Sequence, residues 1–160
     1  AIQYAKLQGA EVTAVDRGEK LDMLLEIGAD HVLDYTKEDF TASGPSYNLI
    51  LDVVGNRSAF ALKRALVKGG TYVMIGGLMP HILLTLVGSP FVSWLEKKKL
   101  TLLIHKPNHG DQMIWKELVE SGQVTPFIYR EYALNETSQA IRDLGEGRVK
   151  GKAVVCLKKG

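Results

Sequence analysis

Within residues 11–35, the spacing of apolar residues changes from that of a β-strand to that of an α-helix and back again. The stretch starts with a short β-branched run and continues through a charged turn that contains one glycine. Leucines then recur at helical spacing, up to a glycine at the point where a helix would end. A second β-branched and aromatic run closes the stretch. The predicted elements are a strand at 11–15, a turn at 16–20, a helix from Leu21 to Gly28 and a strand at 31–35.

The residues that follow repeat this alternation. Residues 47–54 form a nearly continuous apolar run, which is typical of a strand covered on both faces. Helical spacing returns after Asn56 and after Asp111, and both side chains are suited to cap a helix. Further strands are predicted at 71–75 and 100–105, helices at 56–66 and 111–122, and irregular structure with a short helix at 78–98. The alternation predicts an α/β fold with a parallel sheet.

The last part of the chain predicts a smaller unit. Ala140, Ile141 and Leu144 share one face at helical spacing, and Asn135 would cap that helix. Apolar runs lie on either side of it. The tail is therefore predicted to form a strand at 126–132, a helix at 135–144 and a strand at 153–157.

Composition narrows the function classes. The 160 residues are enough for a real core, and a net charge of +2 does not favour nucleic acid as a partner. No apolar run reaches the roughly 18 residues that a membrane span needs, so we expect no membrane partner. The single cysteine, Cys156, can form no internal disulfide, which fits a reducing, cytoplasmic compartment. None of the four histidines shows metal-ligand spacing, so no metal is expected.

The end of the first predicted strand is a candidate nucleotide site. In a doubly wound fold, an acidic residue at such a position hydrogen-bonds a cofactor ribose, and Asp16 occupies it. Arg17 and Lys20 follow in the turn and would instead suit a phosphate. A solvated charged turn is the alternative interpretation of these three residues.

Several segments together resemble a known family. GAEVTAVD, EIGADHVLDY, YNLILDVVGN, KGGTYVMIGG and GRVKGKAVV follow in order along the chain. At these spacings they resemble the medium-chain dehydrogenase/reductase superfamily, and most of all its zinc-independent, quinone-oxidoreductase-like (zeta-crystallin-like) branch. The resemblance extends from Ala1 to about Leu157.

The resemblance implies an incomplete molecule. Family members begin with a catalytic domain, and the first strand and the glycine-rich pyrophosphate turn of a Rossmann-like domain follow it. None of these parts matches this sequence. Residues 1–125 would be an incomplete dinucleotide-binding domain, and residues 126–160 would return to the missing catalytic domain. The expected fold is a doubly wound parallel sheet that lacks its first strand, with a small C-terminal strand-helix-strand tail.

The resemblance also implies a cofactor site. In the quinone-oxidoreductase-like branch, a lysine and a tyrosine 15 positions later flank the 2′-phosphate of NADP(H), and Lys20 and Tyr35 match that spacing. Asp16 departs from the small hydroxyl residue found in the branch, and its charge would repel a phosphate. NADP(H) is favoured on balance, and NAD(H) stays open.

Three further segments would line this cofactor if the resemblance holds. The loop after residue 52 would follow the adenine and ribose, the loop after residue 75 would approach the nicotinamide, and a C-terminal lysine would contact phosphate. The implied residues are Val53, Val54, Gly55, Gly76, Gly77 and Lys150. The alternative is that the glycines only form turns and that the lysine is solvated.

The implied activity is hydride transfer from a nicotinamide cofactor to a quinone, enone or other carbonyl substrate, in a parent protein that forms a homo-oligomer. No catalytic residue is assigned to this chain, because the proton-relay groups would lie in the missing domain, and the isolated chain is expected to be inactive. A non-catalytic interaction module is the main alternative. Another Rossmann-type binder such as a methyltransferase is weaker, since residues 147–155 match the dehydrogenases.

The missing strand generates a prediction about association. In the strand order 3-2-1-4-5-6 the first strand is central, so its loss leaves residues 11–15 and 48–54 as unpaired edges. We expect the isolated chain to close this gap or to self-associate, and light scattering measures which occurs. A monomer whose two edges both remain unpaired would contradict this expectation.

Overall fold

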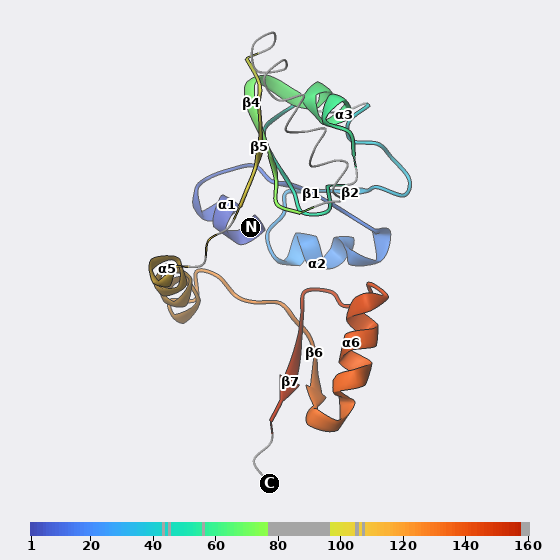
Figure 1. Cartoon of the computed structure of the whole chain (residues 1–160), viewed down its shortest axis with the longest axis vertical. Coiled ribbons are helices and arrows are strands. Elements are labelled where there is room, and N and C mark those ends of the chain that lie inside the picture. Colours follow the sequence, from blue (N-terminus) through green and yellow to red (C-terminus); the bar gives the residue numbers. More distant parts are fainter. Residues whose placement is uncertain are drawn as a thin grey trace. The chain divides into compact units, whose positions relative to one another are not determined.

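A computed structural model describes residues 1–42, 44, 46–55, 57–76, 97–104, 106 and 108–157 (Figure 1). The chain divides into two units, one formed by Ala1–Thr36 with Asn108–Gly160 and the other by Lys37–Pro107. No helix among the described residues is long and apolar enough to cross a membrane.

The N-terminal part of the first unit is a strand-helix-strand motif. Its elements are helix α1 (Ile2–Leu7), strand β1 (Thr13–Asp16), a 3₁₀ turn (Gly18–Lys20), helix α2 (Leu21–Glu26) and strand β2 (His31–Asp34). β1 and β2 pair in parallel, with Thr13 opposite His31 and Asp16 opposite Asp34. The predicted strands and helix are thus confirmed to within two residues. Gly28 ends the helix at a φ of 103°, which glycine adopts without strain.

A small apolar cluster and one carboxylate hold this motif together. Ala14, Leu24 and Ala29 are buried, and partly buried residues of α1, α2 and β2 pack around them. Asp30 accepts hydrogen bonds from the Lys6 ammonium at 2.7 Å and from the Val12 backbone N–H at 2.7 Å. These bonds tie α1 and the start of β1 to the residue that precedes β2.

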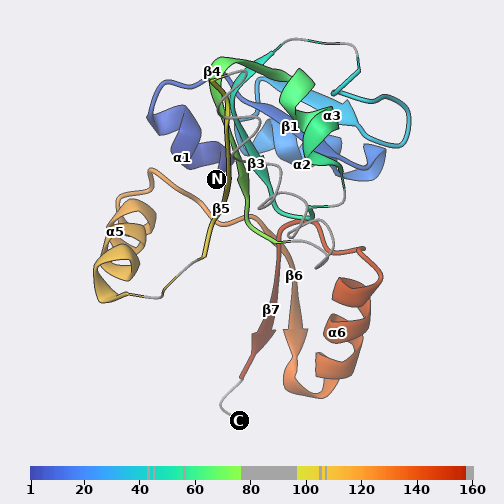
Figure 2. The same ribbon diagram turned by 45° about the horizontal axis from the view of Figure 1, so that its top comes forward.

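The second unit is a three-stranded parallel sheet in the order β3-β4-β5. Its elements are β3 (Tyr47–Asp52), α3 (Ala59–Arg64), β4 (Leu66–Met74) and β5 (Lys99–Leu102). Figure 2 shows the three strands side by side. Leu62, Leu66, Tyr72, Met74 and Leu100 form its buried core. Tyr72 is fully buried, and its hydroxyl donates to Asp52 Oδ2 at 3.0 Å.

The helix predicted at 56–66 is shorter than expected. Ser58 is its cap, because the Ser58 hydroxyl accepts the Ala61 N–H at 3.2 Å, and Asn56 lies outside the described residues. Leu66 is not helical but starts β4, where it pairs with Tyr47. The register then shifts, and Gly69 at a φ of 85° carries the chain through the irregularity. The predicted interval at 78–98 is described only from residue 97 onward.

The strand order confirms the predicted fold class. β1 and β2 form one parallel pair and β3, β4 and β5 form a parallel sheet, with a helix between β1 and β2 and another between β3 and β4, as expected of an α/β fold. Among the described strands, β1 pairs only with β2 and β3 only with β4. Leu49 and Leu51 of β3 are 53% and 46% exposed, although their run predicts burial on both faces.

The C-terminal part of the first unit contains helix α5 (His109–Glu120) and a strand-helix-strand tail. Asn108, not Asp111, caps α5, since its Oδ1 accepts the Asp111 N–H at 2.8 Å. The tail comprises β6 (Ile128–Ala133), a 3₁₀ turn (Leu134–Glu136), α6 (Thr137–Gly145) and β7 (Lys152–Cys156), with β6 and β7 paired in parallel. The predicted tail is confirmed in its elements.

The tail differs from the prediction in its cap and its buried face. Glu136, not Asn135, precedes α6, and its carboxylate accepts the Ala133 N–H at 2.9 Å. Ile141 and Leu144 are 66% and 64% exposed, whereas the buried helix residues are Ala140 and Asp143. α6 is therefore rotated so that a carboxylate, not the leucine face, meets the strands.

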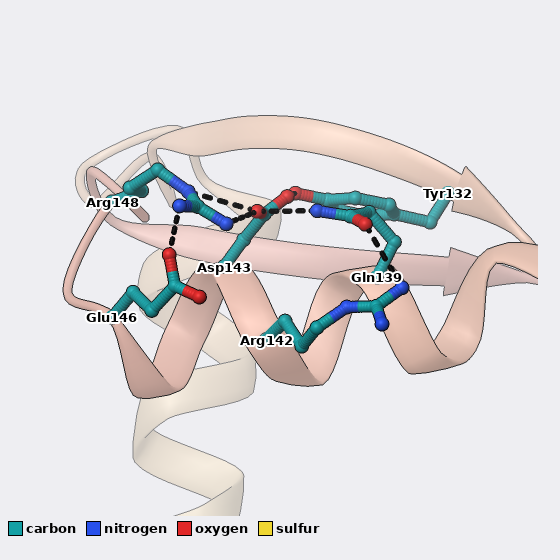
Figure 3. A network of polar contacts seen from close by, with 6 residues as sticks. All are labelled: Tyr132, Gln139, Arg142, Asp143, Glu146 and Arg148. Atoms are coloured by element: carbon teal, nitrogen blue, oxygen red, sulfur yellow. Dashed lines mark hydrogen bonds and ion pairs between the residues drawn. The ribbon is translucent and has the colours of Figure 1, made fainter.

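Asp143 is the centre of a polar network that joins β6, α6 and the loop before β7 (Figure 3). It accepts hydrogen bonds from the Tyr132 hydroxyl at 2.8 Å and the Gln139 amide at 2.8 Å. Nη2 and Nε of Arg148 donate to the same carboxylate at 2.6 Å and 3.0 Å, and Arg148 Nη1 also donates to Glu146. These donors favour the charged form and lower the pKa of Asp143 to about 2, with Arg148 as the largest cause.

Acid should therefore loosen the C-terminal tail. Because the pKa of Asp143 is lower in the folded chain (about 2) than in the unfolded chain (~4), its contribution to stability is complete above pH ~4. It is lost as the pH falls from there toward 2. Backbone amide shifts of residues 126–157, followed by NMR through an acid titration, measure this loss. D143N should flatten the acid dependence, whereas D22N, at an exposed position in α2, should leave it unchanged.

The core of the second unit should depend strongly on Leu62, which is 1% exposed. L62A should lower the free energy of unfolding by about 2–5 kcal/mol, since it removes apolar contacts and leaves a cavity. L103A, at a 48% exposed leucine after β5, is the matched control and should change it by only about 0.5 kcal/mol. Chemical denaturation monitored by circular dichroism gives both values, and equal losses would place the core elsewhere.

Candidate functional site

The candidate site lies where β1 and β2 end. Asp16 is the last residue of β1, and its Oδ1 accepts the backbone N–H of Arg17 at 2.8 Å. The Tyr35 N–H donates to the Asp16 carbonyl at 3.2 Å, which extends the strand pairing by one step. Tyr35 therefore lies beside the turn that follows β1. Parallel strands of such sheets bind ligands beyond their carboxyl ends, where these residues lie.

Side chains from the two strand ends meet at this point. The Arg17 Nε donates to the Tyr35 hydroxyl at 2.7 Å. Both side chains are exposed, so a ligand in solvent can reach them. The structure thus brings together Asp16, Arg17 and Tyr35. Lys20 belongs to the 3₁₀ turn that follows, and its backbone N–H donates to the Arg17 carbonyl at 2.9 Å.

The electrostatics of the pair favour a bound anion. The Tyr35 hydroxyl accepts from the guanidinium and is the largest cause that raises the pKa of Arg17, with Glu19 and Asp16 adding smaller contributions. A guanidinium is charged at neutral pH in any case, so Arg17 is a cation. A guanidinium presents several N–H donors in one plane, an arrangement that suits the oxygens of a phosphate. Asp16 adds a carboxylate that suits ribose hydroxyls.

The loop after β3 is shaped by a residue that sequence reasoning missed. Asp52 Oδ1 accepts the backbone N–H groups of Val54 at 3.1 Å and Gly55 at 2.8 Å. Gly55 has a φ of 60°, a conformation that other residues adopt only with strain. Val53 and Val54 are 67% and 64% exposed, so the predicted contact residues are accessible. The sequence does contain an indication of this turn, because Asp52 lies two residues before Val54 and three before Gly55. An aspartate at this spacing often accepts hydrogen bonds from the backbone of the turn that follows it.

Gly76 has a packing reason to be glycine. A Cβ at this position would lie 2.7 Å from the Val53 carbonyl oxygen, a distance that real Cβ atoms do not tolerate. The end of β4 therefore approaches the end of β3 closely within the second unit. Its glycine partner, Gly77, lies outside the described residues.

Lys150 belongs to the loop between α6 and β7. Arg148 is anchored to Asp143, Val149 is buried, and Lys150 itself is half-buried. Gly151 follows at a φ of 89°, where a side chain would clash with Phe127. The loop is thus well anchored. No contact among the described residues joins Lys150 to the Arg17–Tyr35 pair.

A metal centre has no candidate in the described part of the chain, where no three His, Cys, Asp or Glu side chains gather. His31 is engaged with Glu11, at 2.8 Å. His81 and His105 lie outside the described residues.

Comparison with known proteins gives consistent matches over nearly the whole chain. NAD(P)H oxidoreductase RTN4IP1, mitochondrial, from Mus musculus is 29% identical over 97% of the chain and 44% of its own length. Quinone-oxidoreductase QR1, chloroplastic, from Triphysaria versicolor is 26% identical over 97% of the chain and 47% of its own length. The chain spans about half the length of the curated relatives it matches.

Solved structures show the same fold. The crystal structure of AibC superimposes with a TM-score of 0.78 at 22% identity, over 99% of this chain and 48% of that chain. A quinone oxidoreductase from Coxiella burnetii gives a TM-score of 0.74 at 22% identity, over 99% and 48%. At these identities the likeness establishes the fold alone.

The family model for zinc-binding dehydrogenases matches residues 27–155, which is most of the chain. This match, together with the relatives, confirms the predicted resemblance to the medium-chain dehydrogenase/reductase superfamily. The chain therefore belongs to the zinc-binding dehydrogenase family.

Proposed function

We propose that this chain is the nucleotide-binding half of an NADP(H)-dependent oxidoreductase that reduces a quinone, enone or other carbonyl compound. The relatives include an NAD(P)H oxidoreductase, a quinone oxidoreductase and a 2-methylene-furan-3-one reductase, which support this substrate class. When bound, the nicotinamide ring would supply the hydride, and the protein would orient it.

The single observation that carries the cofactor proposal is the Arg17–Tyr35 pair at the carboxyl ends of β1 and β2. An exposed guanidinium at this position fits the 2′-phosphate of NADP(H). Asp16 opposes it, since its negative charge repels a phosphate and its oxygens fit the ribose hydroxyls of NAD(H). Arg17, Lys20 and Tyr35 match a phosphate site and only Asp16 departs from it, so NADP(H) is preferred and NAD(H) is the weaker ligand.

The other predicted contacts have supporting roles in this proposal. Val53, Val54 and Gly55 would line the adenosine, Gly76 and Gly77 would let the backbone approach the nicotinamide, and Lys150 would contact phosphate. Exposed valines and the turn closed by Asp52 support the first of these roles. The packing of Gly76 against Val53 explains that glycine without a cofactor, so it lends the second no support.

The isolated chain should be inactive. Residues 1–125 would form an incomplete dinucleotide-binding domain, and residues 126–160 would return to a catalytic domain that this sequence does not include. The exposed Ile141 and Leu144 of α6 are consistent with a tail that another part of the parent protein covers. Association through the unpaired strands would make the isolated chain a homo-oligomer.

Calorimetric titration with NADPH and NADH tests the proposal. The chain alone should bind either cofactor weakly, because a glycine-rich pyrophosphate turn supplies much of the affinity in such folds. A version extended at its N-terminus by one strand and a glycine-rich turn should bind in the micromolar range and favour NADPH. Absence of binding in both versions would overturn the proposal and favour the non-catalytic interaction module.

A further inference from the structure

We propose that Tyr72 is a positioning residue that acts through Asp52: it fixes residues 53–55, the loop after β3, in the conformation that presents the loop to an adenosine group. The Tyr72 hydroxyl donates to Asp52 Oδ2 at 3.0 Å. The inference rests on the proposed function, which supplies the ligand. It deepens that function by naming the core residue that holds one of its loops in place.

The register of β3 and β4 brings this tyrosine within reach of Asp52. The two strands pair in parallel, with Ile50 opposite Tyr72 and Asp52 opposite Met74. Side chains two residues apart lie on the same face of a strand, so Asp52 and Tyr72 share one face of the sheet. An aromatic side chain is long enough to reach such a diagonal neighbour. The hydroxyl therefore meets the carboxylate at the carboxyl end of β3.

The burial of Tyr72 keeps its hydroxyl bonded to Asp52. Tyr72 is 0% exposed and lies in the core of the second unit with Leu62, Met74 and Leu100. A buried hydroxyl without a partner is unfavourable, so the folded core favours the bond. Burial is the largest cause that raises the pKa of Tyr72, and the Asp52 carboxylate adds to it. The hydroxyl therefore stays protonated at neutral pH and can donate.

Asp52 transmits this constraint to the loop. While its Oδ2 accepts from Tyr72, its Oδ1 accepts the backbone N–H groups of Val54 at 3.1 Å and Gly55 at 2.8 Å. The Asp52 carbonyl also accepts the Ile75 N–H at 2.8 Å, which ties its backbone to the end of β4. A carboxylate that is bound at both oxygens does not rotate away from the turn. Loss of the Tyr72 hydroxyl should release one of these two restraints.

The conformation of the loop matters because its valines are the groups that would meet the adenosine. Val53 and Val54 are 67% and 64% exposed, so both apolar side chains are available to a flat ring. A loop that is ordered before binding loses less conformational entropy when the ligand arrives. Tyr72 is too deeply buried to touch a ligand, so its influence on affinity passes through Asp52.

Hydrogen exchange of single backbone amides, measured by NMR on the chain itself, tests the restraint. Y72F keeps the ring in the core and removes only the hydroxyl. It should accelerate exchange of the Val54 and Gly55 amides by roughly 3- to 10-fold, as expected for a weakened hydrogen bond to a carboxylate. The Leu103 amide, which donates to the Met74 carbonyl at 2.8 Å, should keep its rate. Equal acceleration of all three amides would show a general loosening of the core and would overturn the inference.

A double-mutant cycle shows whether the effect passes through Asp52. In a D52A background, Y72F should cause no further change at Val54 and Gly55, whereas additive effects would overturn the inference. D52N keeps an oxygen for the loop and an amide that can pair with Tyr72, so it should retain most of the protection that D52A loses.

Y132F is the matched control. Tyr132 is also buried, at 1% exposure, and its hydroxyl donates to a carboxylate oxygen of Asp143 at 2.8 Å, but it belongs to the first unit. Y132F should therefore leave the exchange of Val54 and Gly55 unchanged. A change of the same size as that in Y72F would overturn the inference.

Ligand titrations test the consequence for binding. In the version extended at its N-terminus, Y72F should weaken 5′-AMP and NADPH by roughly 3- to 10-fold and leave nicotinamide mononucleotide unchanged, because only the first two contain adenosine. Unchanged affinity for 5′-AMP, in a version that binds NADPH, would overturn the inference.

Failure of the proposed function would look different. The extended wild-type version would then bind neither NADPH nor 5′-AMP, which would also overturn the role of the loop toward adenosine. The exchange response of Val54 and Gly55 to Y72F needs no ligand and would persist in that case. The two failures are therefore distinguishable.

Discussion

The parallel register of β1 and β2 is the constraint on which the candidate site depends. Because Asp16 lies opposite Asp34, both strands end at the same edge and deliver their next residues side by side. A shift by one residue would move every side chain to the opposite face and separate Arg17 from Tyr35. The small cluster around Ala14 and Leu24 makes such a shift costly, since it would expose the only apolar face of the motif that the described residues bury.

Carboxylates at the ends of strands and helices hold several of the described loops in place by accepting hydrogen bonds. Asp16 and Asp52 each accept backbone N–H groups of the turn that follows their strand. Asp34 does the same for Thr36, and Asp143 gathers three side chains at the end of α6. Backbone donors at strand and helix ends have no partner within the element, so a nearby carboxylate satisfies them and holds the loop in one conformation. The loops that would meet a cofactor are shaped in this way.

The same chain also leaves much apolar surface uncovered. Leu49 and Leu51 on β3, and Ile141 and Leu144 on α6, are all exposed. Isolated exposed apolar residues are ordinary, but a strand and a helix that each expose them in series indicate surfaces that a larger protein buries. This agrees with relatives about twice as long as the chain. The pairing of Arg17 with Tyr35 needs only the β1–β2 motif, so it is present although these apolar residues are exposed.

The sequence by itself determined the element order, the fold class and the family. Period-two and helical spacing located β1, α2, β2 and the tail because these patterns reflect which face of an element is apolar, a local property. The same patterns placed Asp16 and Arg17 at the end of a strand, whereas Tyr35 was indicated only by the resemblance to the family. Only the tertiary structure decided that Arg17 bonds to Tyr35, that Leu66 starts a strand, that Ser58 and Asn108 are the helix caps, and that Asp143 replaces Leu144 in the buried face of α6. These outcomes depend on strand register and on hydrogen bonds between distant residues, which a single-residue pattern does not contain.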